Sequence, residues 1–335
     1  MYKVLIKLII TTTLLMGLGK SYAQDPNFSQ FYANPVYLNP ALTGATECGR
    51  IILNYRNQWP SISNAYVTYN ASYDQVINGI NSGVGLSFVG DVEGDGAINT
   101  NYISGYYSYK LKISESVMLS AGFQGTYVQQ KLNWDQLVFG DQIDPGTGNI
   151  SPISSETPPE NLDKSFVDFS TGMVIGYLDK FFGGVAVHHL TEPNDGFYKE
   201  TGSNLPMKIT VHGGTNLNLS QGGTGEGFGE DLILSPNLLY QQQDKFHQLN
   251  VGAYVKKYPF VGGVWLRHNF ENADAAIALI GITYNNYRIG YSYDFSLSKL
   301  SNRSGGAHEI SFAWQFCVYK GENRRKIRAI KAPTF

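Results

Sequence analysis

Two stretches of the sequence carry side chains at spacings that could bind a metal ion. Residues 91–96 read DVEGDG and place three carboxylates at alternate positions, as calcium loops do, but the later ligands of such a loop do not follow. His188 and His189 are adjacent, and neighbours on a strand point to opposite faces, so both rings are not expected to bind one metal ion. We interpret residues 91–96 as a polar hairpin and expect no metal site.

Other chemistry finds little support. The sequence shows no Ser/His/Asp constellation and no glycine-rich phosphate loop ahead of a helix. A pair of carboxylates or histidines could still meet across a barrel, which keeps a barrel enzyme as a weaker alternative. We expect no catalytic residues, no cofactor and no nucleic-acid partner.

The N-terminus predicts export. Lys3 and Lys7 precede a mostly apolar stretch over residues 5–18, and residues 21–23 read SYA, a small-x-small cleavage site. We expect residues 1–23 to be a signal peptide, and its removal with three lysines changes the formal net charge from −2 to −5. No later run of about 18 apolar residues predicts a transmembrane helix, so residence in a membrane would require a β-barrel.

Alternating segments dominate the chain from Arg50 onward. In residues 306–316, Ile310, Phe312 and Trp314 share one strand face, and Glu309 shares the other with small or polar side chains. A soluble sandwich would turn the apolar face inward, whereas a membrane barrel would turn it to lipid. About fourteen such strands are expected, starting near Arg50, Asn64, Asn81, Asn99, Glu115, Phe166, Phe181, Pro206, Asp231, Phe246, Phe260, Asp274, Asn286 and Gly306.

Connection lengths decide between the two folds. Alternate connections are very short, at residues 113–114, 178–180, 257–259 and 285–286, and residues 75–80 and the glycine-rich 220–230 are the longer exceptions. Those between them are long, at residues 91–98, 131–165, 191–205 and 297–305. Short periplasmic turns and long outer loops are typical of outer-membrane barrels. The sequence therefore predicts an all-β fold: a transmembrane antiparallel β-barrel of about 14 strands over residues 50–317.

Charged side chains at the alternate strand positions that are polar should face the barrel lumen, because lysine or arginine facing lipid costs roughly 2–4 kcal/mol at mid-bilayer. We expect them to brace or hydrate the interior, with a ligand site as the alternative. The candidates are Asp74, Lys110, Lys208, Arg288, Asp294 and Glu309.

The two ends of the mature chain break the alternation. Residues 24–49 contain three prolines and form an irregular, periplasmic N-terminal segment whose aromatic residues predict docking, either on its own barrel as a plug or flap, or on a partner. Residues 318–335 form a basic periplasmic tail, expected to lie near lipid headgroups, to be disordered, or to bind an acidic partner. Cys48 and Cys317 flank the first and last strands at one rim, so they either form a disulfide there or remain free thiols.

Several motifs resemble the PorP/SprF family of the type IX secretion system of Bacteroidetes. The resemblance rests on QDPNFSQFYANPVYLNPALTG at residues 24–44 and YRNQWP at residues 55–60. It continues through GVG at 83–85 with Asp91, VWLR at 264–267, YSYD at 291–294, GAHEI at 306–310 and PTF at 333–335. Ala332 stands where relatives often place a cysteine, which leaves Cys317 freer to pair with Cys48.

The resemblance implies a non-enzymatic outer-membrane protein. It implies partners in the secretion machinery, including periplasmic ring components, and a large secreted adhesin or its C-terminal sorting domain, with a role in gliding motility. A passive porin or small-solute transporter is the alternative. The residues expected to bind partners are Phe28, Phe31, Tyr32, Arg56, Trp59, Arg324, Arg325 and Arg328.

Overall fold

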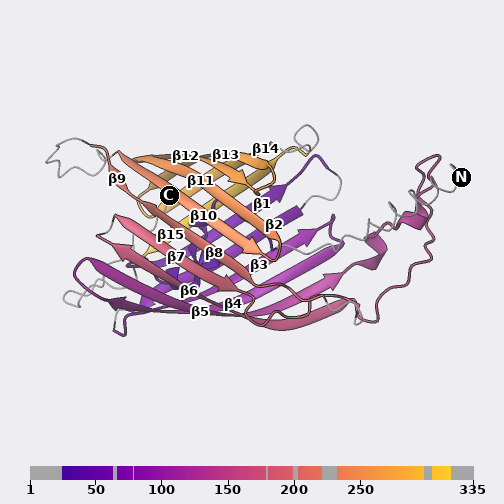
Figure 1. Ribbon diagram of the computed structural model, residues 1–335, viewed down its shortest axis with the longest axis horizontal. Coiled ribbons are helices and arrows are strands. Elements are labelled where there is room, and N and C mark those ends of the chain that lie inside the picture. The colour runs from indigo at the N-terminus through magenta and orange to yellow at the C-terminus, as the bar shows by residue number, and fades with distance from the viewer. Residues whose placement is uncertain are drawn as a thin grey trace, which may run out of the picture.

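The computed structural model describes residues 25–62, 66–77, 79–178, 180–198, 203–220, 232–297 and 304–317. Within them the chain forms one antiparallel β-barrel (Figure 1). The strands are β1 Gly49–Gln58, β2 Tyr66–Ile77, β3 Ser82–Glu93, β4 Ile98–Lys112, β5 Val117–Leu132, β6 Asp163–Tyr177, β7 Phe181–His188, β8 Lys208–Thr215, β9 Leu217–Asn218, β10 Ile233–Gln243, β11 Phe246–Lys257, β12 Phe260–His268, β13 Ala273–Tyr284, β14 Tyr287–Ser296 and β15 Ala307–Phe316.

Every strand of the barrel pairs with its neighbours in sequence, and β1 pairs with β15 from Gly49↔Phe316 to Gln58↔Ala307 to close the wall. The short β9 follows β8 after Asn216 and pairs with the same partner, β10. Because β8 and β9 together occupy one strand position, the described part of the chain forms a fourteen-stranded wall. The predicted barrel is confirmed, and each predicted strand start lies within three residues of the observed one.

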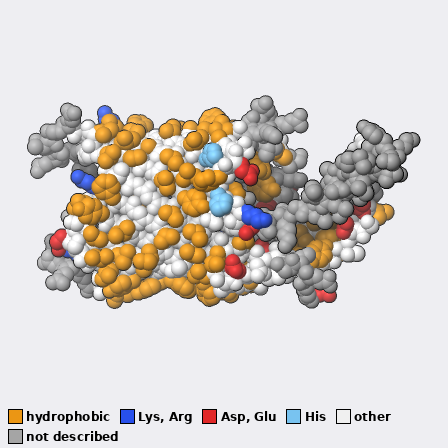
Figure 2. Space-filling view, viewed as in Figure 1, with side chains coloured by type: hydrophobic (Ala, Val, Ile, Leu, Met, Phe, Trp, Pro, Cys, Tyr) orange, Lys and Arg blue, Asp and Glu red, His pale blue; other side chains and the backbone are white. Residues whose placement is uncertain are grey.

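The wall has an apolar outside and a polar inside. On β15, Ile310 and Trp314 are exposed, whereas Glu309 and Ser311 are buried in the lumen. Apolar side chains cover most of the visible outer face in Figure 2, and charged ones lie toward its ends. The predicted lumen residues Asp74, Lys110, Lys208, Asp294 and Glu309 are buried, and Arg288 is half-buried.

The two rims differ. One carries the tight turns after β4, β6, β11 and β13, together with Gly49 and Phe316. The other carries residues 133–162 between β5 and β6, with the 3-10 helices η3 Trp134–Gln136 and η4 Gly140–Gln142, and residues 189–207 between β7 and β8. The β10–β11 turn at residues 244–245 is a short exception on this long-loop rim. Strands β4, β5 and β6 are the longest and carry their loop past the rest of the wall (Figure 1).

Candidate functional site: a plug across the lumen

Residues 25–48, here named the plug, lie inside the barrel. They form three short helices, η1 Phe31–Ala33, α2 Pro35–Leu38 and η2 Pro40–Leu42. Pro35 and Pro40 occupy first helical turns, where a missing N–H costs nothing, and Asn39 caps η2 by accepting from the Ala41 N–H at 2.9 Å. The sequence left a plug, a periplasmic flap and a partner-binding segment open, and the structure shows the plug: residues 25–48 lie in the lumen, where the inner wall supplies partners for their irregular backbone.

Glycines in the wall make room for the plug backbone. A Cβ on Gly122 of β5 would lie 2.3 Å from the Ala41 nitrogen, and one on Gly172 of β6 would lie 2.1 Å from the Asn39 Oδ1. Any larger side chain at these lumen positions would collide with the plug. The glycines of β5 and β6 therefore leave the space on the inner wall that η2 occupies.

Aromatic side chains bridge the plug to the opposite wall. Phe31 packs edge-on against Trp265 of β12, with ring centroids 4.6 Å apart. Tyr32 contacts Phe182 of β7 at 5.8 Å and Tyr254 of β11 at 6.4 Å. All five rings are buried. The plug thus contacts both sides of the lumen and crosses the central passage.

Four charges surround Ser29. Arg56 and Arg267 face Asp294 and Glu309, with guanidinium–carboxylate distances of 3.0 Å from Arg56 to Asp294, 3.2 Å from Arg56 to Glu309 and 3.1 Å from Arg267 to Asp294. The two positive and two negative groups cancel, as burial requires. This buried network links β1, β12, β14 and β15.

The plug backbone completes that network. The N–H groups of Ser29 and Gln30 donate to the two oxygens of Glu309 at 2.7 and 3.1 Å. The Ser29 hydroxyl donates to Asp294 at 2.5 Å and accepts from Arg56 and Arg267 at 2.7 Å each. One hydroxyl therefore uses its donor and both lone pairs, and Ser29 and Gln30 together give all four charged side chains a hydrogen bond with the plug.

A second polar group holds Asp25 near the long-loop rim. His189 lies between two carboxylates, with Nε2 2.8 Å from Asp25 and Nδ1 2.8 Å from Asp168. Lys208 also pairs with Asp25. Both ring nitrogens must donate to these acceptors, so His189 is a cation.

The electrostatics agree with that protonation state. Burial lowers the pKa of His189, but the Asp25 and Asp168 carboxylates outweigh it and raise the pKa to about 9. Burial likewise raises the pKa of Asp25, and His189 and Lys208 outweigh it, holding the pKa well below its usual range. Asp25 and His189 therefore remain ionised at neutral pH. The four residues Asp25, Asp168, His189 and Lys208 are here named the latch.

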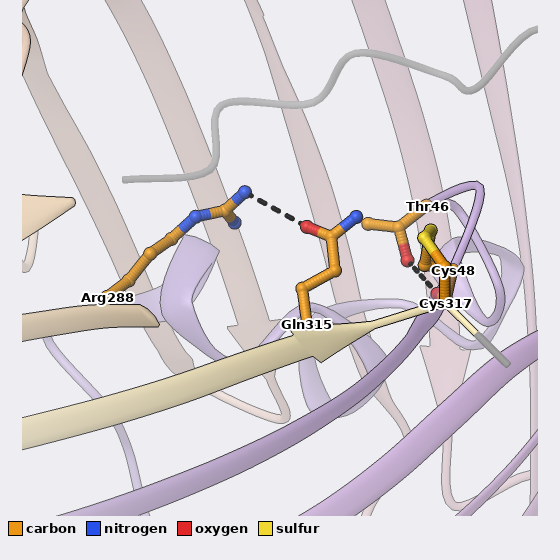
Figure 3. Close-up of a disulfide and its surroundings, with 5 residues drawn as sticks. All are labelled: Thr46, Cys48, Arg288, Gln315 and Cys317. Atoms are coloured by element: carbon orange, nitrogen blue, oxygen red, sulfur yellow. Dashed lines mark hydrogen bonds between the residues drawn. A yellow bond between two sulfur atoms is a disulfide. The ribbon is translucent and has the colours of Figure 1, made fainter. Parts of the chain in front are cut away.

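The other end of the plug is fixed at the short-turn rim. Arg50 forms a two-pronged ion pair with Asp74 at 2.9 Å, and Asp74 accepts from the Gly44 N–H at 2.8 Å. Lys110 donates to the Gly44 carbonyl. Cys48 and Cys317 form a disulfide with Cα atoms 4.6 Å apart (Figure 3). Nearby, Arg288 donates to the side chain of Gln315 at 3.2 Å.

The residues expected to bind partners fall into two groups. Phe28, Phe31, Tyr32 and Arg56 are buried within this chain, and Trp59 packs against Tyr66 at 5.7 Å. In this arrangement the four buried side chains stabilise the plugged barrel rather than face solvent. Arg324, Arg325 and Arg328 lie outside the described residues, as do the expected signal peptide and basic tail. Partner binding at all these positions stays a prediction.

Sequence reasoning missed the latch and Arg267. His188 and His189 were expected on opposite faces, but β7 ends at His188, and the positive φ of His189 at 59° turns its ring toward the same cavity. The sequence did carry a signal for Arg267. It lies two residues after Trp265, so the alternation of side chains along β12 places both on the same buried face. The described residues contain no group of ligands that could hold a metal ion.

Fold and site together define a plugged outer-membrane β-barrel. Within the described residues, no helix has the length and apolarity needed to cross a membrane. Residues 20–314 match the family described as type IX secretion system membrane protein PorP/SprF. The chain therefore belongs to the PorP/SprF family.

Several solved structures are similar to this chain, and one of them, TbuX, supports the barrel fold. The toluene transporter TbuX of Ralstonia pickettii has a TM-score of 0.50 at 10% identity, covering 84% of this chain and 93% of that one. A Pseudomonas aeruginosa FadL homologue has a TM-score of 0.41 at 14% identity, covering 87% and 92%. The translocator domain of the autotransporter NalP from Neisseria meningitidis has a TM-score of 0.36 at 12% identity, covering 84% and 92%. No curated protein matches this chain.

Proposed function

We propose that this protein helps export or anchor a large secreted adhesin-type cargo at the outer membrane and links that cargo to the secretion and gliding machinery. The observation that carries the proposal is the plug. An anchor or adaptor needs a stable barrel with binding surfaces at its rims, whereas a porin needs an open lumen. Here three sets of polar contacts hold residues 25–48 across the lumen: the charged network around Ser29, the latch, and the contacts of Gly44 at the short-turn rim.

The disulfide adds a second argument. It fastens the base of the plug to Cys317, the residue that directly precedes the basic segment 318–335 in the sequence. That tail carries six basic residues and one acidic residue, which suits an acidic partner on the periplasmic side. We propose that the tail binds the periplasmic ring and that the barrel secures the cargo.

A passive porin or small-solute transporter is the alternative function. The similar barrel TbuX is described as a toluene transporter. In this chain, however, residues 25–48 lie across the lumen, and the cavity left between them and β3–β8 has a volume of about 40 Å³, room for a few water molecules. This favours the adaptor.

The test is purification of the intact protein from native outer membranes in detergent. We expect ring components and one large secreted protein to co-purify, and cells lacking the protein to lose surface adhesin. Deleting residues 318–335 should abolish association with the ring while leaving a heat-modifiable barrel. Changing Arg324, Arg325 and Arg328 to Gln tests charge alone. Ring association that survives both changes would contradict the tail-docking proposal.

A further inference from the structure

The connection between β5 and β6, residues 133–162, has an unusual charge composition. Its thirty residues include five carboxylates and no lysine, arginine or histidine; the carboxylates are Asp135, Asp141, Asp144, Glu156 and Glu160. The loop is carried beyond the rest of the wall on the longest strands (Figure 1). Its field is therefore uniformly negative and faces away from the membrane.

Two of the carboxylates organise the loop. Asp141 accepts from the Ser155 N–H at 2.6 Å and from the hydroxyls of Ser154 and Ser155 at 2.9 and 2.8 Å. Asp144 accepts from the N–H groups of Gly146 and Thr147 at 2.7 and 3.0 Å, which closes a tight turn. Hydrogen bonds to the ionised form lower the pKa of both carboxyls. The loop is thus a defined structure in which Asp141 and Asp144 keep their charge to a lower pH than an ordinary aspartate.

Apolar side chains project from this acidic frame. Ile143 and Ile150 pair in a single β-bridge, and Ser151 N–H donates to the Gln142 carbonyl at 2.8 Å, so the chain forms a small hairpin. Ile150 is 61% exposed and Ile153 is 80% exposed. An exposed apolar cluster on a preorganised loop outside the lipid band is typical of a protein-binding surface.

A cleft adjoins the base of the loop. It has a volume of about 720 Å³ and lies between residues 159–165 and residues 194–198. Its lining includes Glu160, Asp163, Lys164, Phe197 and Tyr198. The Lys164 ammonium donates within the cleft wall, to the Asn194 side chain and the Gly196 carbonyl. The volume falls in the range of sites that hold a few side chains.

We propose that residues 133–162 and the adjoining cleft form an extracellular docking surface for a polypeptide segment that carries both apolar and basic side chains. The absence of any cation in the loop selects a basic partner over an acidic one. The exposed side chains of Ile150 and Ile153 offer apolar contact beside the carboxylates. The inference rests on the proposed function, because it assigns exported protein as the partner at this rim.

The first test uses synthetic peptides on the full-length protein in detergent. An alternating Lys-Val octapeptide should bind, whereas its Glu-Val and Lys-Ser counterparts should not, and raising salt should weaken binding because exposed charges are screened. Changing Ile150 and Ile153 together to Ser should weaken binding at least about tenfold, since each isoleucine loses apolar burial. Ile113→Ser, an exposed isoleucine on the opposite rim, is the matched control. Equal binding of Lys-Val and Lys-Ser peptides would overturn the apolar half of the proposal.

The second test places a photoreactive side chain at position 153 in cells. A crosslinked segment from an exported protein, read by mass spectrometry as basic and apolar, is the expected result. Crosslinks only to lipopolysaccharide or to a second copy of this chain would overturn the proposal. Ring association is measured on the same variant, so a failed docking surface is distinguished from a failed adaptor.

Discussion

Ser29 shows how a single small side chain can organise four buried charges. Its hydroxyl and backbone N–H contact Arg56, Arg267, Asp294 and Glu309, which come from four strands of the wall. In a lumen shielded from water, removing one of these charges leaves the others uncompensated. The plug and the wall therefore stabilise one another through this network.

Glu309→Gln tests that dependence. The substitution removes one negative charge and leaves a net positive charge buried, so the free energy of unfolding should fall by about 3–5 kcal/mol. Urea titration of the heat-modifiable band measures it. The matched control is Glu115→Gln, whose pair with Lys112 lies at the exposed rim; there the change should stay within about 0.5 kcal/mol. Similar losses in both variants would contradict a special role for the buried network.

The latch makes stability depend on pH. Folding raises the pKa of His189 from 6.5 to about 9, so its contribution is complete below pH 6.5 and is lost as pH rises through about 9. Folding lowers the pKa of Asp25, so that contribution is present above 3.8 and is lost as pH falls through the lower folded value. The melting temperature should decline between pH 6.5 and 9.

His189→Gln should flatten this decline in melting temperature. The control is His247→Gln, which removes a ring stacked on Tyr240 in the β10–β11 hairpin and should leave the decline intact. Differential scanning calorimetry across the pH range provides the measurement. An unchanged slope in the His189 variant would assign the decline to other groups.

At the scale of elements, the position of the plug depends on glycines in the strands, because these residues have no side chain to occupy the space. Gly122→Ala would place a methyl group 2.3 Å from the plug backbone, which cannot move without losing the contacts on its other side. We expect it to displace η2, lower the melting temperature by several degrees and expose residues 25–48 to protease. Gly125→Ala, three residues along the same strand, meets only the Phe169 ring at 3.6 Å and should behave like the parent protein. Protease mapping compares the two.

The wall could be predicted from the sequence because lipid on one face and a polar lumen on the other impose a period of two. The strand from Tyr287 and the closing strand from Ala307 follow that pattern closely. The path of the plug could not be predicted, because Pro35 and Pro40 exclude a long helix or strand without specifying which partners the short helices contact. The use of Gly122 and Arg267 becomes apparent only when strands distant in sequence are brought around one lumen.

At the scale of the whole molecule, the plug predicts a closed barrel. The intact protein should show no steady conductance in planar bilayers. Deleting residues 25–44, which keeps Cys48 and the wall, should open a lasting conductance. Deleting residues 134–153, also twenty residues, from the loop beyond the long-loop rim is the size-control and should leave the barrel closed. Steady conductance of the intact protein would support the porin alternative.

The disulfide also determines how the molecule would bear tension. Without it, a pull on the chain after Cys317 would peel β15 away from β1, one pair of hydrogen bonds at a time. With Cys317 bonded to Cys48, residues 48–317 form a covalent ring, and the same pull is shared with the first strand and with the plug. If periplasmic machinery pulled repeatedly on the chain after Cys317, the force would act on the whole barrel and would not separate β15 from β1.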